Sequence, residues 1–154
     1  MFLGYALRPT SEGSIHIRGA LPENPPKIVP NFFASEYDRR TVVALTRKMR
    51  EIVARSPIAE LIAGETVPGD EVSTDEDILR NAMTNGGNGY HTLGTCAMGP
   101  NDDDVVDARL RVRGVESLRV IDASVFPNMP SGNNNAPTQA LAWHAARLIL
   151  DDRV

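Results

Sequence analysis

The stretch Y-H-T-L-G-T-C-A-M-G, Tyr90–Gly99, is followed at residues 105–127 by V-V-D-A-R-L-R-V-R-G-V-E-S-L-R-V-I-D-A-S-V-F-P. Residues 131–138 then read S-G-N-N-N-A-P-T and open onto an apolar run. Glycines surround His91, which places this histidine on a loop where backbones can pack closely. A proline just after a polar cluster is typical of a helix start. We therefore expect a helix over residues 137–150.

The preceding part of the chain carries signals for both strands and helices. Short strands are expected at residues 4–7 and 14–18, with a possible edge strand at 28–29. From Ser35 the apolar residues recur at helical spacing, and Pro57 limits the helix, so residues 35–56 should form a long amphipathic helix. Residues 73–76, S-T-D-E, form a capping box that should begin a second helix.

Two further strands are expected at residues 109–113 and 118–121, where apolar residues mark a sheet. Residues 99–104, G-P-N-D-D-D, are interpreted as a surface turn, because they lack the oxygen spacing of a calcium loop. These patterns predict an α+β fold in which an antiparallel sheet is covered by helices, with a C-terminal strand and helix.

The composition limits the class of protein. The chain has 154 residues, 42% hydrophobic and 23% charged, which suits one soluble domain. A net charge of −4 argues against nucleic acid as a partner. A single cysteine excludes an internal disulfide, and no apolar run is long enough to span a bilayer. We expect a cytoplasmic protein without a membrane partner.

His91 is the strongest candidate for proton transfer, because histidine exchanges protons near neutral pH. The alternative is that His91, like many loop histidines, has no chemical role. His16 and His144 are interpreted as a solvent-side strand residue and a helix packing or surface residue. Cys96 is interpreted as a small buried hydrophobe, and His91 with Cys96 supplies too few ligands for zinc, so no metal site is expected.

The predicted start of the last helix is a second candidate site. Exposed amides at a helix N-terminus favour negative charge. If residues 133–135, three asparagines, hold that end, the site suits a phosphate, a carboxylate or a reduced flavin. Helix capping alone explains only part of this cluster.

The quoted motifs closely resemble the C-terminal part of the glucose-methanol-choline (GMC) flavoprotein oxidoreductases, which include choline dehydrogenase-like enzymes. Residues 7–18, L-R-P-T-S-E-G-S-I-H-I-R, also resemble the substrate domain of that family, so the likeness covers nearly the whole chain. The resemblance implies an enzyme that oxidises the CH-OH group of an alcohol by hydride transfer to FAD.

The resemblance also implies roles for particular residues. His91 would act near the flavin as a base or as a stabiliser of the substrate oxygen, facing Asn135 as the second catalytic residue. The residues implied in cofactor binding are Asp122, Ala123, Asn135, Ala136, Pro137 and Thr138. Among these, the amides of Ala136 and Thr138 would stabilise negative charge on the flavin, whereas Pro137 has no N–H to donate.

The sequence lacks the glycine-rich phosphate loop with which such enzymes bind the dinucleotide. We therefore expect an N-terminal FAD-binding half to be missing, and the isolated fragment to be inactive and to bind FAD poorly. Residues 1–117 would then form the substrate-binding domain, and residues 118–154 would return to the FAD domain. The alternative is a stand-alone binding or structural module, derived from this domain, that has no redox chemistry.

Overall fold

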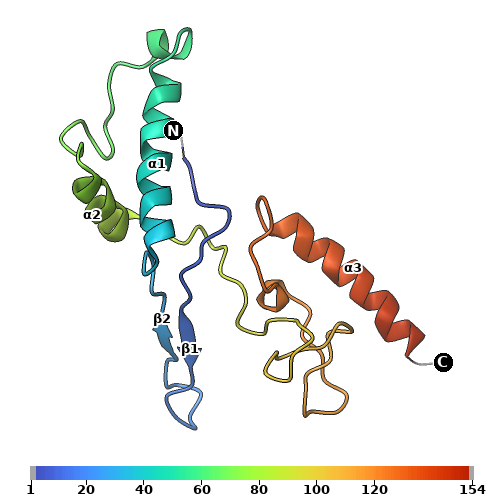
Figure 1. Ribbon diagram of the computed structural model, residues 1–154. Coiled ribbons are helices and arrows are strands. Elements are labelled where there is room, and N and C mark those ends of the chain that lie inside the picture. Colours follow the sequence, from blue (N-terminus) through green and yellow to red (C-terminus); the bar gives the residue numbers. More distant parts are fainter. Residues whose placement is uncertain (1–2, 153–154) are drawn as a thin grey trace. The chain divides into compact units, whose positions relative to one another are not determined.

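The computed structural model describes residues 3–152, and these divide into two compact units, Met1–Gly87 and Asn88–Val154. Figure 1 shows their helices and strands. The first unit holds a hairpin and two helices, and the second holds a set of paired loops and one helix. The α+β class expected from the sequence is confirmed. The predicted division after residue 117 separates a substrate-binding part from a part that returns to the FAD domain. This division stays a prediction.

The described residues form one two-stranded sheet, in which β1 (Ser14–His16) pairs with β2 (Lys27–Val29) in antiparallel fashion. Ile15 lies opposite Ile28 in this register. All residues of both strands are exposed, including these two isoleucines, so the predicted covering of the sheet by helices is not present in this unit. His16 is exposed, as expected.

Helix α1 (Glu36–Val53) begins where the sequence predicts, because the Ser35 hydroxyl accepts a hydrogen bond from the Asp38 amide at 3.1 Å. Its next neighbour in the chain is the short 3₁₀-helix η1 (Ile58–Leu61), which follows Pro57. The predicted strand at residues 4–7 was wrong, since these residues form no strand although all of them are described. Instead Gly4 packs on α1 so closely that a Cβ atom there would lie 2.8 Å from Met49 Sδ.

The carboxylate of Asp38 fastens the segment before β1 to the start of α1. Only 4% of this aspartate is exposed. One oxygen accepts from the Thr10 amide at 2.9 Å, and the other accepts from the Ser11 amide at 2.7 Å. Burial raises the pKa of Asp38, but hydrogen bonds from Ser11, Thr10 and Ser35 outweigh burial and lower the pKa below its ordinary value. Asp38 therefore stays charged in the folded chain.

Helix α2 (Asp75–Asn85) lies beside α1 (Figure 1). The predicted capping box was one residue out of register, because the N-cap is Thr74 and its partner is Asp77. The Thr74 hydroxyl accepts from the Asp77 amide at 3.1 Å and donates to the Asp77 carboxylate at 2.6 Å. Ile78 on this helix is 2% exposed and forms part of the core of the first unit.

The second unit is built around a core of four buried residues, with five partly buried residues packed against it. The buried four are Val106, Leu110, Val125 and Ala145. The others are Met98, Val112, Val120, Ile121 and Leu141. The two strands predicted at residues 109–113 and 118–121 were wrong as regular strands. These segments do pair, but only through isolated bridges such as Arg111 with Arg119.

Helix α3 (Asn135–Asp151) ends against this paired segment. The carboxylate of Asp152, just past the helix, accepts from Arg109 at 2.5 Å and from Arg111 at 2.6 Å, and Arg119 forms a third ion pair with it. A carboxylate at a helix C-terminus is unfavourable for the helix dipole, and the three guanidinium groups offset this. Hydrogen bonds from Arg111 and Arg109 lower the pKa of Asp152 to about 2.

Replacing Asp152 by asparagine is expected to lower the melting temperature of the chain at pH 7. Because the pKa of Asp152 is lower in the folded state, its ion pairs stabilise the fold above the unfolded pKa of about 4. That stabilisation is lost as the pH falls towards 2. Circular dichroism melts should therefore show a gap between wild type and variant that closes between about pH 4 and pH 2. Asp151→Asn is the matched control, and a gap unchanged at pH 2 would contradict the assignment.

Candidate functional site

His91 lies at the end of a tight turn in the second unit. The His91 amide donates to the carbonyl oxygen of Asn88 at 3.1 Å, and the two residues between have φ angles of 59° for Gly89 and 61° for Tyr90. Two successive positive φ angles define a type I′ turn. Tyr90 is not a glycine, and the Asn88 side chain supports it by accepting from the Tyr90 amide at 3.0 Å. The turn thus sets the position of the histidine backbone.

Main-chain hydrogen bonds join the histidine loop to the segment around Asp122. The Cys96 amide donates to the Ser124 carbonyl at 3.0 Å, and the Met98 amide donates to the Val125 carbonyl at 2.9 Å. Val125 itself is completely buried in the core. The two motif segments, residues 90–99 and 105–127, are therefore parts of one structure. Cys96 is only partly buried, which differs from its interpretation as a small buried hydrophobe.

The three consecutive asparagines before and within α3 have different surroundings. Asn133 Oδ1 lies 2.7 Å from His91 Nε2, which makes it the asparagine that contacts the histidine. Asn134 is buried and is the N-cap of α3, but its side chain makes no capping hydrogen bond. Asn135 is exposed, and its Oδ1 atom accepts from Gln139 at 3.2 Å. The hydrogen bond between these segments thus joins His91 to Asn133, two positions before the predicted partner Asn135.

The amides at the start of α3 are those available to an anion. The Thr138 amide donates to the Asn134 carbonyl at 3.0 Å, and the Thr138 hydroxyl donates to the same oxygen at 2.7 Å. Thr138 therefore uses its amide within the helix, contrary to the donor role expected for it. Pro137 has no amide hydrogen. Of the two amides expected to donate, only that of Ala136 remains. The preceding residue, Asn135, adds an amide at the same helix end, and both residues are exposed.

Asp122 and Ala123 lie at the short 3₁₀-helix η2 (Ala123–Val125). One carboxylate oxygen of Asp122 accepts from the Ser124 amide at 2.8 Å and from the Ser124 hydroxyl at 2.5 Å. Asp122 is thus the N-cap of η2, and its residue is exposed. Capping η2 is compatible with the predicted contact between Asp122 and a cofactor. That contact stays a prediction.

The sequence analysis missed Asn133 as the partner of His91. The signal was present in the N-N-N run, but capping, packing and catalytic roles cannot be divided among three adjacent asparagines by their spacing alone. The division depends on the path of the chain before the helix, where the Gly132 amide donates to the Pro130 carbonyl at 2.8 Å. That short turn sets which asparagine faces the histidine.

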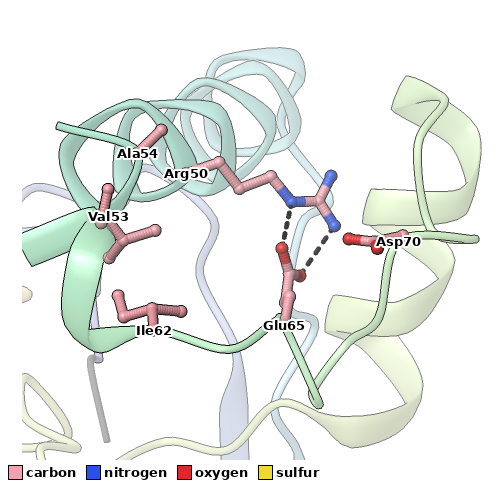
Figure 2. Close-up of a pocket in the computed structure, with 7 residues that line it drawn as sticks. Arg50, Val53, Ala54, Ile62, Glu65 and Asp70 are labelled. Carbon is pink, nitrogen blue, oxygen red and sulfur yellow. Dashed lines mark hydrogen bonds and ion pairs between the residues drawn. The ribbon is translucent and has the colours of Figure 1, made fainter.

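The first unit contains a hollow of about 400 Å³ beside the end of α1. Figure 2 shows Arg50 pointing to Glu65, with Asp70 nearby, and apolar residues of α1 and of the segment that follows it to one side. Arg50 binds Glu65 through two hydrogen bonds of 2.8 Å, and these raise the pKa of Arg50 and lower the pKa of Glu65. Because both charges are matched, this ion pair fastens the loop to α1.

Among residues 3–152, no group of three or more histidine, cysteine, aspartate or glutamate side chains is arranged to hold a metal ion. Within the same range, no helix has the length and apolar character needed to cross a membrane.

The chain matches the family model for GMC oxidoreductases over residues 9–142. It is 38% identical over 144 residues to an alcohol dehydrogenase [acceptor] of Pseudomonas putida, covering 94% of this chain and 26% of that protein. It is 42% identical over 145 residues to an oxygen-dependent choline dehydrogenase of Vibrio vulnificus, covering 93% of this chain and 26% of that protein. An FAD-dependent oxidoreductase from Chaetomium thermophilum has a similar structure, with a TM-score of 0.84, 32% identity, and coverage of 96% of this chain and 26% of that chain.

The fold, together with these matches, defines the class of protein as a C-terminal region of the GMC oxidoreductase type. The chain belongs to the GMC oxidoreductase family. It spans about a quarter of the length of the curated relatives that it matches.

Proposed function

We propose that this chain is the C-terminal part of an FAD-dependent enzyme that oxidises the CH-OH group of an alcohol, with His91 and Asn135 as the catalytic pair. The observation that carries the proposal is the hydrogen bond of 2.7 Å between His91 and Asn133. This bond brings the histidine loop to the start of α3 in one compact unit, two residues before Asn135.

The residues at the start of α3 fit one end of a flavin ring. The N-cap Asn134 provides no side-chain hydrogen bond there, so the amides of Asn135 and Ala136 can donate to a negatively charged partner. The residues that would hold FAD are these two together with Asp122, Ala123, Pro137 and Thr138. When bound, the flavin supplies the acceptor for the hydride that leaves the alcohol carbon.

The side chains of this unit supply the proton chemistry in the proposed reaction. His91 accepts or shares the proton of the substrate hydroxyl. Asn135 donates a hydrogen bond to the substrate oxygen and orients it, while its own oxygen remains bonded to Gln139. Because both groups lie on backbone fixed by hydrogen bonds, little ordering is needed when a substrate binds.

Large apolar residues are exposed on both units, and they support the proposal that the N-terminal half of the protein is a partner of this chain. On α3, Trp143 is 73% exposed and Leu150 is also exposed. In the first unit, Ile17 is 90% exposed and Ile28 is also exposed. Large apolar groups on a surface mark interaction sites, and we propose that an FAD-binding half packs on α3. We retain a cytoplasmic location as part of this proposal.

The chain alone is expected to bind FAD weakly or not at all, because its sequence has no glycine-rich loop for the pyrophosphate. Titration of the chain into FAD, followed by flavin fluorescence, should show little change. Joined to the N-terminal half in one polypeptide, it should purify as a yellow protein whose flavin is bleached by primary alcohols under anaerobic conditions. A full-length protein that binds no flavin would contradict the proposed function.

The second candidate is a stand-alone binding or structural module without redox chemistry. The lack of a dinucleotide loop in this sequence favours it. The DNA upstream of the Met1 codon separates the two candidates. A continuous reading frame that encodes a glycine-rich strand-turn-helix would support the oxidoreductase, whereas a clean start site would support the module.

A further inference from the structure

Helix α3 is one uninterrupted helix that links the proposed site to a cluster of ion pairs (Figure 1). Its first residue is Asn135, the proposed catalytic partner of His91. Its last turn leads to Asp152, whose carboxylate binds three arginine side chains. A helix with intact hydrogen bonds transmits a displacement from one end to the other as a rigid element. The position of Asp152 therefore affects the position of Asn135.

The middle of α3 is held to the core mainly by one small side chain. Ala145 is the one buried residue of this helix, all of whose residues are described, and it lies in the core with Leu110 and Val125. Leu141, one turn earlier, is only partly buried against this core. Packing on an alanine methyl group fixes the distance between the helix and the core, but it leaves the tilt of the helix poorly determined. Contacts at the ends of α3 must therefore set its direction.

The arginine cluster supplies such contacts at the C-terminal end. The carboxylate of Asp152 accepts from Arg109 at 2.5 Å and from Arg111 at 2.6 Å, and Arg119 forms the third ion pair. Arg109 also donates to the carbonyl oxygen of Leu148 at 3.4 Å. The arginines brace one another, because Arg119 Nε donates to the Arg109 carbonyl oxygen at 3.2 Å. The cluster thus ties the end of α3 to a braced part of the unit.

The N-terminal end of α3 lies beside the histidine loop. There the His91 ring lies 2.7 Å from the side chain of Asn133, two residues before the helix. The histidine loop reaches the core separately, through the main-chain hydrogen bonds of Cys96 and Met98. Because the loop and the helix are anchored by different contacts, the distance between them depends on the tilt of α3.

The spacing of these contacts along α3 amplifies a small displacement. At about 1.5 Å per residue, Asn135 lies about 15 Å before Ala145, and Asp152 lies about 10 Å beyond it. If the helix tilts about Ala145, a shift of about 1 Å at the cluster moves the start of α3 by about 1.5 Å. A misplacement of about 1 Å at a reacting group can lower a rate about 100-fold.

We propose that Asp152 is a positioning residue: its ion pairs with the three arginines set the tilt of α3 and thereby the distance between Asn135 and His91. The proposal rests on the proposed function insofar as it gives this distance a role in catalysis. It also gives a reason for a carboxylate at the C-terminal end of a helix, where the helix dipole disfavours negative charge.

The first test measures the position of the helix start in the 154-residue chain by nuclear magnetic resonance. In Asp152→Asn, we expect weaker nuclear Overhauser effects between the His91 ring and the Asn133 side chain. The amide signals of the first turn of α3 should also shift. Asp152→Glu keeps a carboxylate and should restore both, and Asp151→Asn is the matched control that should change neither. Changes confined to the last turn of α3 in Asp152→Asn would overturn the proposal.

A second variant perturbs the cluster without changing α3, which keeps the test decisive if Asp152→Asn fails to fold. Arg111→Gln removes one guanidinium group and should also shift the amide signals of the first turn of α3. Arg147→Gln, at an exposed position on α3, is the control and should not shift them. The methyl signals of Val125 in the core report that the unit remains folded. A folded Arg111→Gln variant with an unchanged first turn would overturn the proposal.

The third test uses the flavin-loaded full-length protein, at a temperature well below the melting temperature of every variant. We expect Asp152→Asn to lower kcat by about 10- to 100-fold with little change in KM, since a misplaced reacting group slows chemistry more than binding. Asp152→Glu should recover most of kcat. Spectroelectrochemistry should show a lower flavin reduction potential in Asp152→Asn, because the positive end of the helix dipole is displaced.

Wild-type kcat and reduction potential in Asp152→Asn would overturn the positioning role. A wild-type full-length protein that binds no flavin would instead refute the proposed function. The effect of Asp152 on the start of α3 is measured in the chain without flavin, so the two failures are distinguishable.

Discussion

Replacing His91 by alanine is expected to lower the turnover of the full-length, flavin-loaded protein by about 10²- to 10⁴-fold, the range for loss of a positioned acid–base group. The flavin should remain bound, because none of the residues proposed to hold it is changed. Anaerobic stopped-flow measurement of flavin bleaching by an alcohol gives the rate, and the absorbance spectrum of the purified variant gives the flavin content.

His144→Ala is the matched control for this experiment. His144 is exposed on α3 and makes no part of the proposed site, so its loss should leave turnover within a few-fold of wild type. Unchanged turnover in the His91 variant would remove this residue from the chemistry. Loss of flavin together with activity would instead assign His91 a role in holding the cofactor.

Replacing Asp38 by alanine is expected to lower the free energy of unfolding of the first unit by about 2–4 kcal/mol, because two partly buried hydrogen bonds from backbone amides to a charged acceptor are then lost. These amides belong to Thr10 and Ser11. Urea denaturation followed by circular dichroism measures the loss in helix α1. Trp143, the single tryptophan of the chain, lies in the second unit, and its fluorescence reports that unit separately.

Glu36→Ala is the control, because Glu36 lies two residues earlier on the same helix and forms only an exposed ion pair with Arg40. Its effect should stay below about 1 kcal/mol. The lowered pKa of Asp38 means that its stabilisation is present above the unfolded pKa of about 4 and is lost as the pH falls through the lower folded pKa. Equal stability of wild type and Asp38→Ala at pH 7 would contradict the anchoring role.

The helices could be predicted from the sequence because their signals are local. Ser35 and Thr74 cap the two helices of the first unit. The hydroxyl of each accepts a hydrogen bond from the amide three positions later. The strands could be predicted only where a nearby partner exists, as between β1 and β2. Residues 109–113 have a strand-like pattern, but their bridges involve single residues on separate segments. Pairing over such distances depends on the path of the whole unit.

The candidate site could be predicted as a set of motifs but not as a set of contacts. The sequence indicated His91 and the start of the last helix, and both lie in one unit. The contact of His91 with Asn133, and the use of the Thr138 amide within α3, depend on a turn of three residues before the helix. Such a turn leaves little trace in the residue pattern. The catalytic role of Asn135 remains a prediction.

The link between Cys96 and Ser124 uses amide and carbonyl groups, which every residue at those positions except proline would provide in the same way. The exposed side chains beside it, Thr92 and Thr95, can therefore be exchanged without altering the link. Saturation mutagenesis at these two positions would vary the chemical environment around the imidazole while its supporting scaffold stays intact. The loop is thus a suitable starting point for redesigning substrate preference by directed evolution.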